Sequence, residues 1–115
     1  MARSSASRLA DHFVNYLFHE YQGDNRHVQQ VASWLGLLLL GLEKLGVEWR
    51  PYRARQLIFE REGKRYKARY RHQIKPRGGI EFVEVAAERG MPDVRVARTI
   101  TSLEDAAAFY DRPGL

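Results

Sequence analysis

The stretch GKRYKARYRHQ, residues 63–73, decides the fold. Basic side chains alternate in it with aromatic and small ones, Arg65, Lys67, Arg69 and Arg71 against Tyr66, Ala68, Tyr70 and His72. Successive side chains of a β-strand point to opposite faces, so this period of two predicts a strand. One of its faces would be cationic and open, and the other would pack against a covering layer.

Turn residues on both sides of this stretch divide the chain beyond Pro51 into short runs rich in apolar residues. The runs 55–60, 64–73, 80–86 and 94–100 are predicted as strands, with turns around Gly63, at 75–79 and at 88–93. Because the turns are short, the strands should form a four-stranded antiparallel meander over 53–100. The run IEFVEV has acids on both alternating faces, so its buried side stays open.

In the N-terminal part the apolar residues recur at helical spacing instead. Serines at 4, 5 and 7 can cap a first helix that Gly23 ends. Asp24 or Asn25 can begin a second helix, in which apolar residues recur in steps of three and four until Gly46. Together they predict a helical hairpin over 5–46. The second helix has more apolar surface than one neighbour can cover, so it should lie between two layers.

A third helix is predicted at the C-terminal end, over 102–110. Thr101 or Ser102 can cap it, with Glu104 and Asp105 as capping-box partners. The expected fold is therefore α+β, a single domain over 1–115. It consists of two N-terminal helices, a four-stranded antiparallel sheet and a C-terminal helix, with all helices packed on one sheet face.

Positive charge is concentrated in one quarter of the chain. Eleven of the 19 Lys and Arg but only two of the 14 acids lie between residues 50 and 77, which gives that segment +9 and the remainder −4. Clustered charge of one sign is typical of polyanion-binding surfaces. We expect nucleic acid, DNA in preference to RNA, to bind the following residues: Arg53, Arg55, Arg65, Lys67, Arg69, Arg71, Lys75 and Arg77.

A second interpretation of this charge stays open. Glu60, Glu81 or Glu84 can pair across strands with the arginines and neutralise the face. Ion-paired arginines would remove the basis of the polyanion hypothesis. They would favour a small interaction or adaptor protein.

The segments GKRYKARYR, 63–71, and TITSLEDAAAFY, 99–110, together resemble the arm-type DNA-binding domains of phage integrases. In that family a three-stranded sheet, whose second strand is rich in lysine and arginine, precedes a helix and enters the DNA groove. The resemblance implies that the cations of 65–71 face DNA and that Ala106 and Phe109 pack the helix. It also implies a mobile-element or regulatory role. This chain adds two N-terminal helices and a fourth strand to the pattern.

Two further functions are alternatives. The leucine-rich second helix can form a homodimer or a partner groove through Trp34, Leu37, Leu40 and Gly41. A toxin-like ribonuclease is the third hypothesis, with His72 as general base toward an RNA 2′-hydroxyl.

Other kinds of site have little support in the sequence. Without cysteine there is no disulfide, and a cytoplasmic location is the default expectation. The apolar run 31–42 is too short to span a membrane, which needs about 20 residues. His12, His19 and His27 lack a recognised ligand spacing. We therefore expect no membrane contact, no metal and no cofactor.

Overall fold

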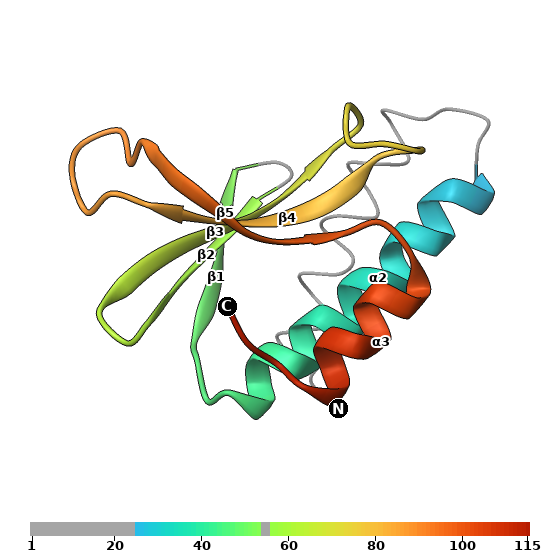
Figure 1. Ribbon diagram of the computed structural model, residues 1–115, viewed down its shortest axis with the longest axis horizontal. Coiled ribbons are helices and arrows are strands. Elements are labelled where there is room, and N and C mark those ends of the chain that lie inside the picture. Colours follow the sequence, from blue (N-terminus) through green and yellow to red (C-terminus); the bar gives the residue numbers. More distant parts are fainter. Residues whose placement is uncertain (1–24, 54–55) are drawn as a thin grey trace.

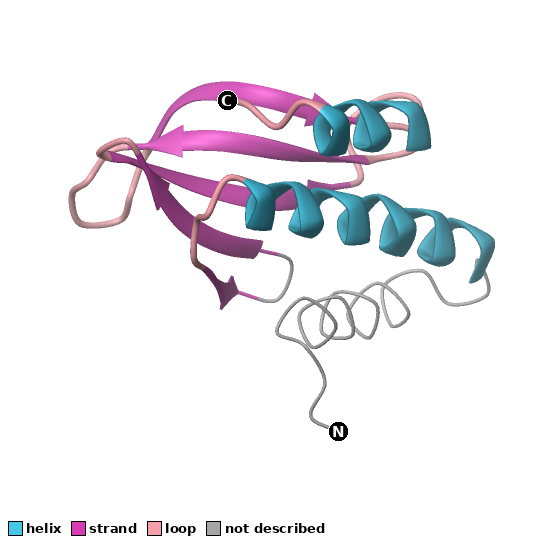
Figure 2. Cartoon of the chain, turned by 90° about the horizontal axis from the view of Figure 1, so that it is seen from below, coloured by secondary structure: helices cyan, strands magenta, loops and turns pink. Residues whose placement is uncertain are grey.

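A five-stranded antiparallel sheet and two helices, α2 and α3, make up the computed structural model, which describes residues 25–53 and 56–115 (Figure 1). The strand order is β1-β2-β3-β4-β5, and Figure 2 shows both helices on the same side of the sheet. The elements are α2 Asn25–Lys44, β1 Trp49–Arg53, β2 Gln56–Arg61, β3 Lys64–Arg71, β4 Gly79–Val85, β5 Asp93–Ile100 and α3 Leu103–Asp111. The predicted first helix lies outside the described residues.

Helix α2 begins and ends where the sequence predicts. The apolar residues Val31, Leu35, Leu38 and Leu42 line one of its faces and are at most 1% exposed. Gly46, at φ 71°, takes the left-handed conformation that follows a helix, and its amide donates to the carbonyl of Glu43. The period of the apolar residues thus places α2 over the core.

The sheet has one strand more than the sequence predicts. Strand β1, WRPYR, pairs antiparallel with β2, with Trp49 opposite Phe59 and Pro51 opposite Leu57. The sequence does not predict this strand because it contains Pro51, and a proline, which lacks an amide hydrogen, normally indicates that a segment is not a strand. At a sheet edge that missing donor is tolerated, and β1 occupies such an edge.

Strand β3 confirms the predicted division of its two faces. Tyr66, Ala68 and Tyr70 are 2–4% exposed and join the core that contains α2. The register also settles β4, because Ala68 lies opposite Phe82 and Arg69 lies opposite Glu81. Phe82 therefore belongs to the helix-covered face and Glu81 to the outer face.

Helix α3 lies beside α2 on the same face of the sheet and packs against both (Figure 2). Its Phe109 is fully buried and stacks on Phe82 of β4, with 5.1 Å between ring centroids. On the other side it meets Gly41 of α2 so closely that a Cβ there would lie 2.7 Å from Cε1 of Phe109. Ser102 caps α3 by accepting a hydrogen bond from the Asp105 amide, as predicted.

The two edges of the sheet are both irregular. Strand β1 carries Pro51, and its register against β2 shifts between Pro51 and Arg53. On the opposite edge the register of β5 against β4 shifts twice, so that Val94 and Ala97 have no directly opposed partner. In the part of the chain that the structure describes, neither helix is long and apolar enough to cross a membrane.

Candidate nucleic-acid interface

Four of the five β3 cations, Arg65, Lys67, Arg69 and Arg71, stand on the outer face, as predicted, but they do not form an unpaired row. Arg65 reaches across to β2, where its Nη2 lies 2.9 Å from Oε1 of Glu60. Arg71 contacts β4, with its Nη1 3.4 Å from Oε1 of Glu81. These two pairs follow the cross-strand alternative that the sequence left open.

Arg69 is the most completely engaged of the four. Its Nε lies 2.8 Å from Oε1 of Glu81, and its Nη2 lies 2.9 Å from Oδ2 of Asp93. Burial lowers the pKa of Arg69, but hydrogen bonds to Asp93 and Glu81 outweigh it and leave that pKa above its usual value. The charge of Arg69 is thus balanced within the sheet. The expectation of an unpaired face is wrong at 65, 69 and 71.

Lys67 is the β3 cation that makes no ion pair with a described carboxylate. Its Nζ lies 5.3 Å from the ring centroid of Tyr52 on β1. Cζ of Arg53 lies at the same distance from that ring. One half-buried aromatic ring on an edge strand thus has two cations beside it. The sequence reasoning missed Tyr52 because it did not predict β1.

The antiparallel order brings more cations to the same end of the sheet. The β1–β2 connection and the β3–β4 turn lie at one end, since alternate connections of a meander share an end. Lys75 and Arg77 are exposed in the β3–β4 turn. We call the following residues the cationic surface: Arg50, Tyr52, Arg53 and Lys67. Among the described residues, none of its cations makes an ion pair, and neither do Lys75 and Arg77. Arg55 lies outside the described residues.

The opposite end of the sheet has ion pairs. Glu84 accepts from Arg95 at 2.8 Å and lies 3.8 Å from Lys64, and Arg61 lies 3.6 Å from its neighbour Glu62. The positive charge that the sequence concentrates in one segment is therefore divided in space. Ion pairs balance cations at both ends of the sheet, with Glu62 and Glu84 at one end and Glu81 at the other. The cations that make no ion pair with a described residue include those around Tyr52 and in the β3–β4 turn.

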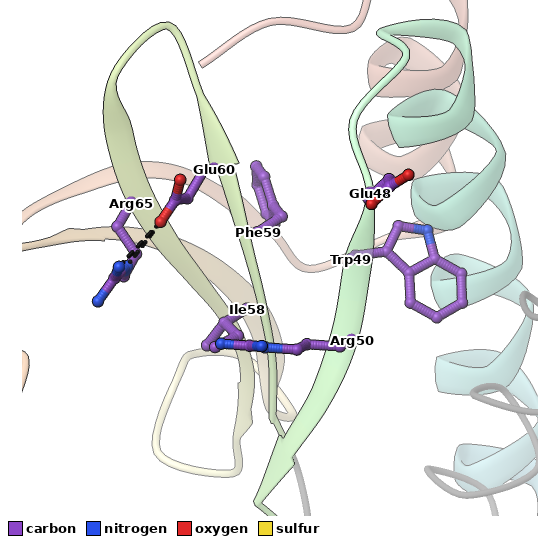
Figure 3. A pocket seen from close by; sticks show the side chains of 7 residues that line it. All are labelled: Glu48, Trp49, Arg50, Ile58, Phe59, Glu60 and Arg65. Carbon is purple, nitrogen blue, oxygen red and sulfur yellow. Dashed lines mark hydrogen bonds and ion pairs between the residues drawn. The ribbon is translucent and has the colours of Figure 1, made fainter.

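A hollow of about 420 Å³ adjoins the cationic surface where β1 and β2 diverge (Figure 3). Arg50 lines it and extends beside Ile58, its partner in the sheet register. The Glu60–Arg65 ion pair forms another wall. Arg50 and Tyr52 are two residues apart on β1, so a ligand that follows the outer face passes from the ring to the hollow.

The four residues predicted to make a dimer are not gathered on one exposed surface. Trp34 is 6% exposed and belongs to the core, and Gly41 faces Phe109 of the same chain. Leu37 packs partly against the core, whereas Leu40 is 45% exposed. Most of the predicted interface is thus used inside the fold.

The structure describes two of the histidines that the sequence offers as catalytic or metal-binding candidates, His72 and His27. His72 is exposed at the start of the β3–β4 turn, and no hydrogen bond to a described residue orients its ring. His27 is buried and its Nε2 lies 2.7 Å from the hydroxyl of Tyr70. Residues 25–53 and 56–115 contain no group of three side chains arranged to hold a metal ion. His12 and His19 lie outside these ranges.

Ala106 and Phe109, which the integrase resemblance implies as packing positions, are both 0% exposed. Burial of an alanine and an aromatic residue in an amphipathic helix is common to many folds, so it does not by itself identify a family. Comparisons with protein-family models, with curated proteins and with solved structures found no match. The function is therefore inferred from the arrangement of this chain's own residues.

Proposed function

We propose that this chain binds nucleic acid through the cationic surface and not through the whole β3 row. The observation that carries the proposal is the pair of cations beside the Tyr52 ring, Arg53 and Lys67, which make no ion pair with a described residue, in a chain of net charge +5. Cations without internal partners release counterions when they meet phosphates, and this release is the main source of affinity in nonspecific nucleic-acid binding.

The ion pairs define which residues contribute. Arg69 would have to leave two carboxylates before it met a phosphate, and the buried Glu81, 6% exposed, would then keep only the longer contact with Arg71. Among the described residues, the interaction that Lys67 and Arg53 would lose is a cation–π contact with the Tyr52 ring at 5.3 Å, which is weak. The proposed interface is therefore centred on β1 and on Lys67 in the middle of β3.

The test compares two double variants of equal net charge. Arg53→Gln with Lys67→Gln removes two cations of the cationic surface, and Arg61→Gln with Arg95→Gln removes two ion-paired cations from the other end. Affinity for a fluorescein-labelled oligonucleotide is measured by anisotropy over a series of salt concentrations. We expect the first variant to bind at least about tenfold more weakly and to lose about one unit of salt slope per cation. The second should bind within about threefold of the wild type.

Two results would contradict the proposal. One is the absence of binding to any nucleic acid at low salt. The other is an equal loss in both double variants, which would show that net charge alone matters. A sequence-specific regulatory role would require base contacts in addition, because phosphate contacts carry no sequence information.

A homodimer through α2 is the second candidate, favoured by the exposure of Leu40 beside the partly buried Leu37. A stable interface covers about 800 Å² on each partner, more than these two side chains supply. Light scattering at high concentration tests it directly. A dimer that Leu40→Glu dissociates would support this candidate.

A further inference from the structure

We infer that the cationic surface takes single-stranded nucleic acid, with one base stacked on the ring of Tyr52. The inference rests on the proposed function and specifies its ligand. Its basis is an aromatic ring on an edge strand with two cations beside it, each 5.3 Å from the ring centroid. Phosphates alone would need only the cations.

A duplex and a single strand make different demands on such a surface. A duplex keeps its bases stacked inside and offers phosphates to a protein, so a tyrosine gains little there. A single strand exposes the flat face of each base, and proteins that hold single strands combine a cationic track with aromatic platforms. Tyr52 with Lys67 and Arg53 has both components within one patch.

The cations beside Tyr52 do not prevent stacking. Both stand 5.3 Å from the ring centroid, near the outer limit of about 6 Å for a cation–π contact. At an exposed site such a contact contributes less than a base stacked on an aromatic ring. A base can therefore replace one cation over the ring, and that cation then turns to the phosphate of the same nucleotide.

The path of the strand follows from β1. Arg50 lies two residues from Tyr52 on the same outer face, beside Ile58 and at the wall of the hollow (Figure 3). Side chains two residues apart on a strand are about 6 to 7 Å apart, close to the spacing of successive phosphates. In this arrangement the nucleotide next to the stacked one meets Arg50.

The experiment uses the full chain and three probes of one sequence, a 12-nucleotide single-stranded DNA, the same strand as RNA, and the DNA duplex. Each carries 2-aminopurine, whose fluorescence is quenched when the base stacks on an aromatic ring. We expect tighter binding of single strands than of duplex at equal salt, together with quenching. The two single strands distinguish DNA from RNA as the ligand.

Two variants of Tyr52 isolate the ring. Tyr52→Leu keeps apolar bulk but removes the aromatic face, and we expect it to weaken single-strand binding about tenfold and to abolish the quenching, with little effect on duplex. Tyr52→Phe should bind within about threefold of the wild type. Circular dichroism checks that both variants are folded, and the quenching measured on the wild type tests the inference even if Tyr52→Leu is unfolded.

The outcomes separate the inference from the proposed function. If no probe binds, the proposed function itself fails. If the duplex binds at least as tightly as the single strands, or if the wild type binds without quenching, the inference fails and the cationic surface remains a phosphate-binding surface. An unchanged affinity of folded Tyr52→Leu for single strands also overturns it.

Discussion

Oε1 of Glu81 lies 2.8 Å from Nε of Arg69, and the residue that supplies this carboxylate is 6% exposed. The same oxygen lies 3.4 Å from Nη1 of Arg71. One acid of β4 thus forms ion pairs with two of the four outer-face cations of β3. The face that alternation predicts to be cationic is in consequence largely balanced, and Lys67 is the cation of β3 that makes no ion pair with a described residue.

Removing this acid should destabilise the protein. Glu81→Gln leaves the charges of Arg69 and Arg71 in partly buried positions, with Asp93 alone to balance Arg69. We expect a loss of about 2 to 4 kcal/mol in the free energy of unfolding, measured by urea denaturation. Glu60→Gln is the control, because the Glu60 side chain is 67% exposed and its pair with Arg65 should contribute less than about 1 kcal/mol. Equal losses in the two variants would contradict this account of Glu81.

Although Glu81→Gln should lower stability, it should strengthen binding to nucleic acid. Folded Glu81→Gln releases Arg69 and Arg71 toward the outer face, so its affinity for nucleic acid should rise at least about threefold, with a steeper salt dependence. Glu88→Gln is matched in net charge and removes an exposed acid that makes no ion pair in the described chain. A similar gain in both variants, measured by anisotropy, would show a general charge effect and not a local release.

The contact between α2 and α3 predicts a contrast between two glycines. Gly41→Ala introduces a Cβ 2.7 Å from the ring of Phe109, which is fully buried and stacked on Phe82. We expect a net loss of about 1 to 3 kcal/mol in the free energy of unfolding, because the crowding exceeds the gain in helix propensity. At Gly36 no atom of the described residues lies within 4 Å of such a Cβ, so Gly36→Ala should gain up to about 1 kcal/mol. Urea denaturation of both variants makes the comparison, and a stabilised Gly41→Ala would contradict the described packing.

The cap of α3 predicts another contrast, between two serines. Ser102→Ala removes the acceptor for the Asp105 amide and should cost about 1 kcal/mol in a thermal or urea unfolding measurement. Ser33 lies within α2 and donates only to the carbonyl of Gln29, which its helix already uses. Ser33→Ala should therefore be neutral or slightly stabilising. Equal losses at both positions would show that Ser102 does not act as a cap.

Local patterns in the sequence predict the elements but not their partners. The alternation in β3 correctly separates the buried Tyr66, Ala68 and Tyr70 from the outer cations because a strand's period is fixed by its backbone. Gly41, expected at a dimer or partner surface, lies instead against Phe109 of the same chain. The pairing of Arg69 with Asp93 joins residues 24 positions apart through two intervening turns. No local pattern specifies such a contact.

Less of the proposed site than of the fold follows from the sequence, for the same reason. Tyr52 lies in β1, a strand that the sequence does not predict because it contains Pro51. A proline is compatible with a sheet only at an edge strand, and the sequence alone does not show which strand is at the edge. The pattern RPYR, an aromatic residue between arginines beside a proline, was the available signal. Register then decides which cations meet carboxylates, and the register of β5 depends on its two irregular positions.

Those irregular edges have a consequence for self-association. Pro51 cannot donate a hydrogen bond to an added strand, and the positions without opposed partners in β5, Val94 and Ala97, prevent a flat, continuous row of donors and acceptors. Val94 and Val96 are more than half exposed and would otherwise favour stacking of one sheet on the next. The chain thus has exposed apolar side chains at an edge without the straight template that cross-β fibrils require for growth.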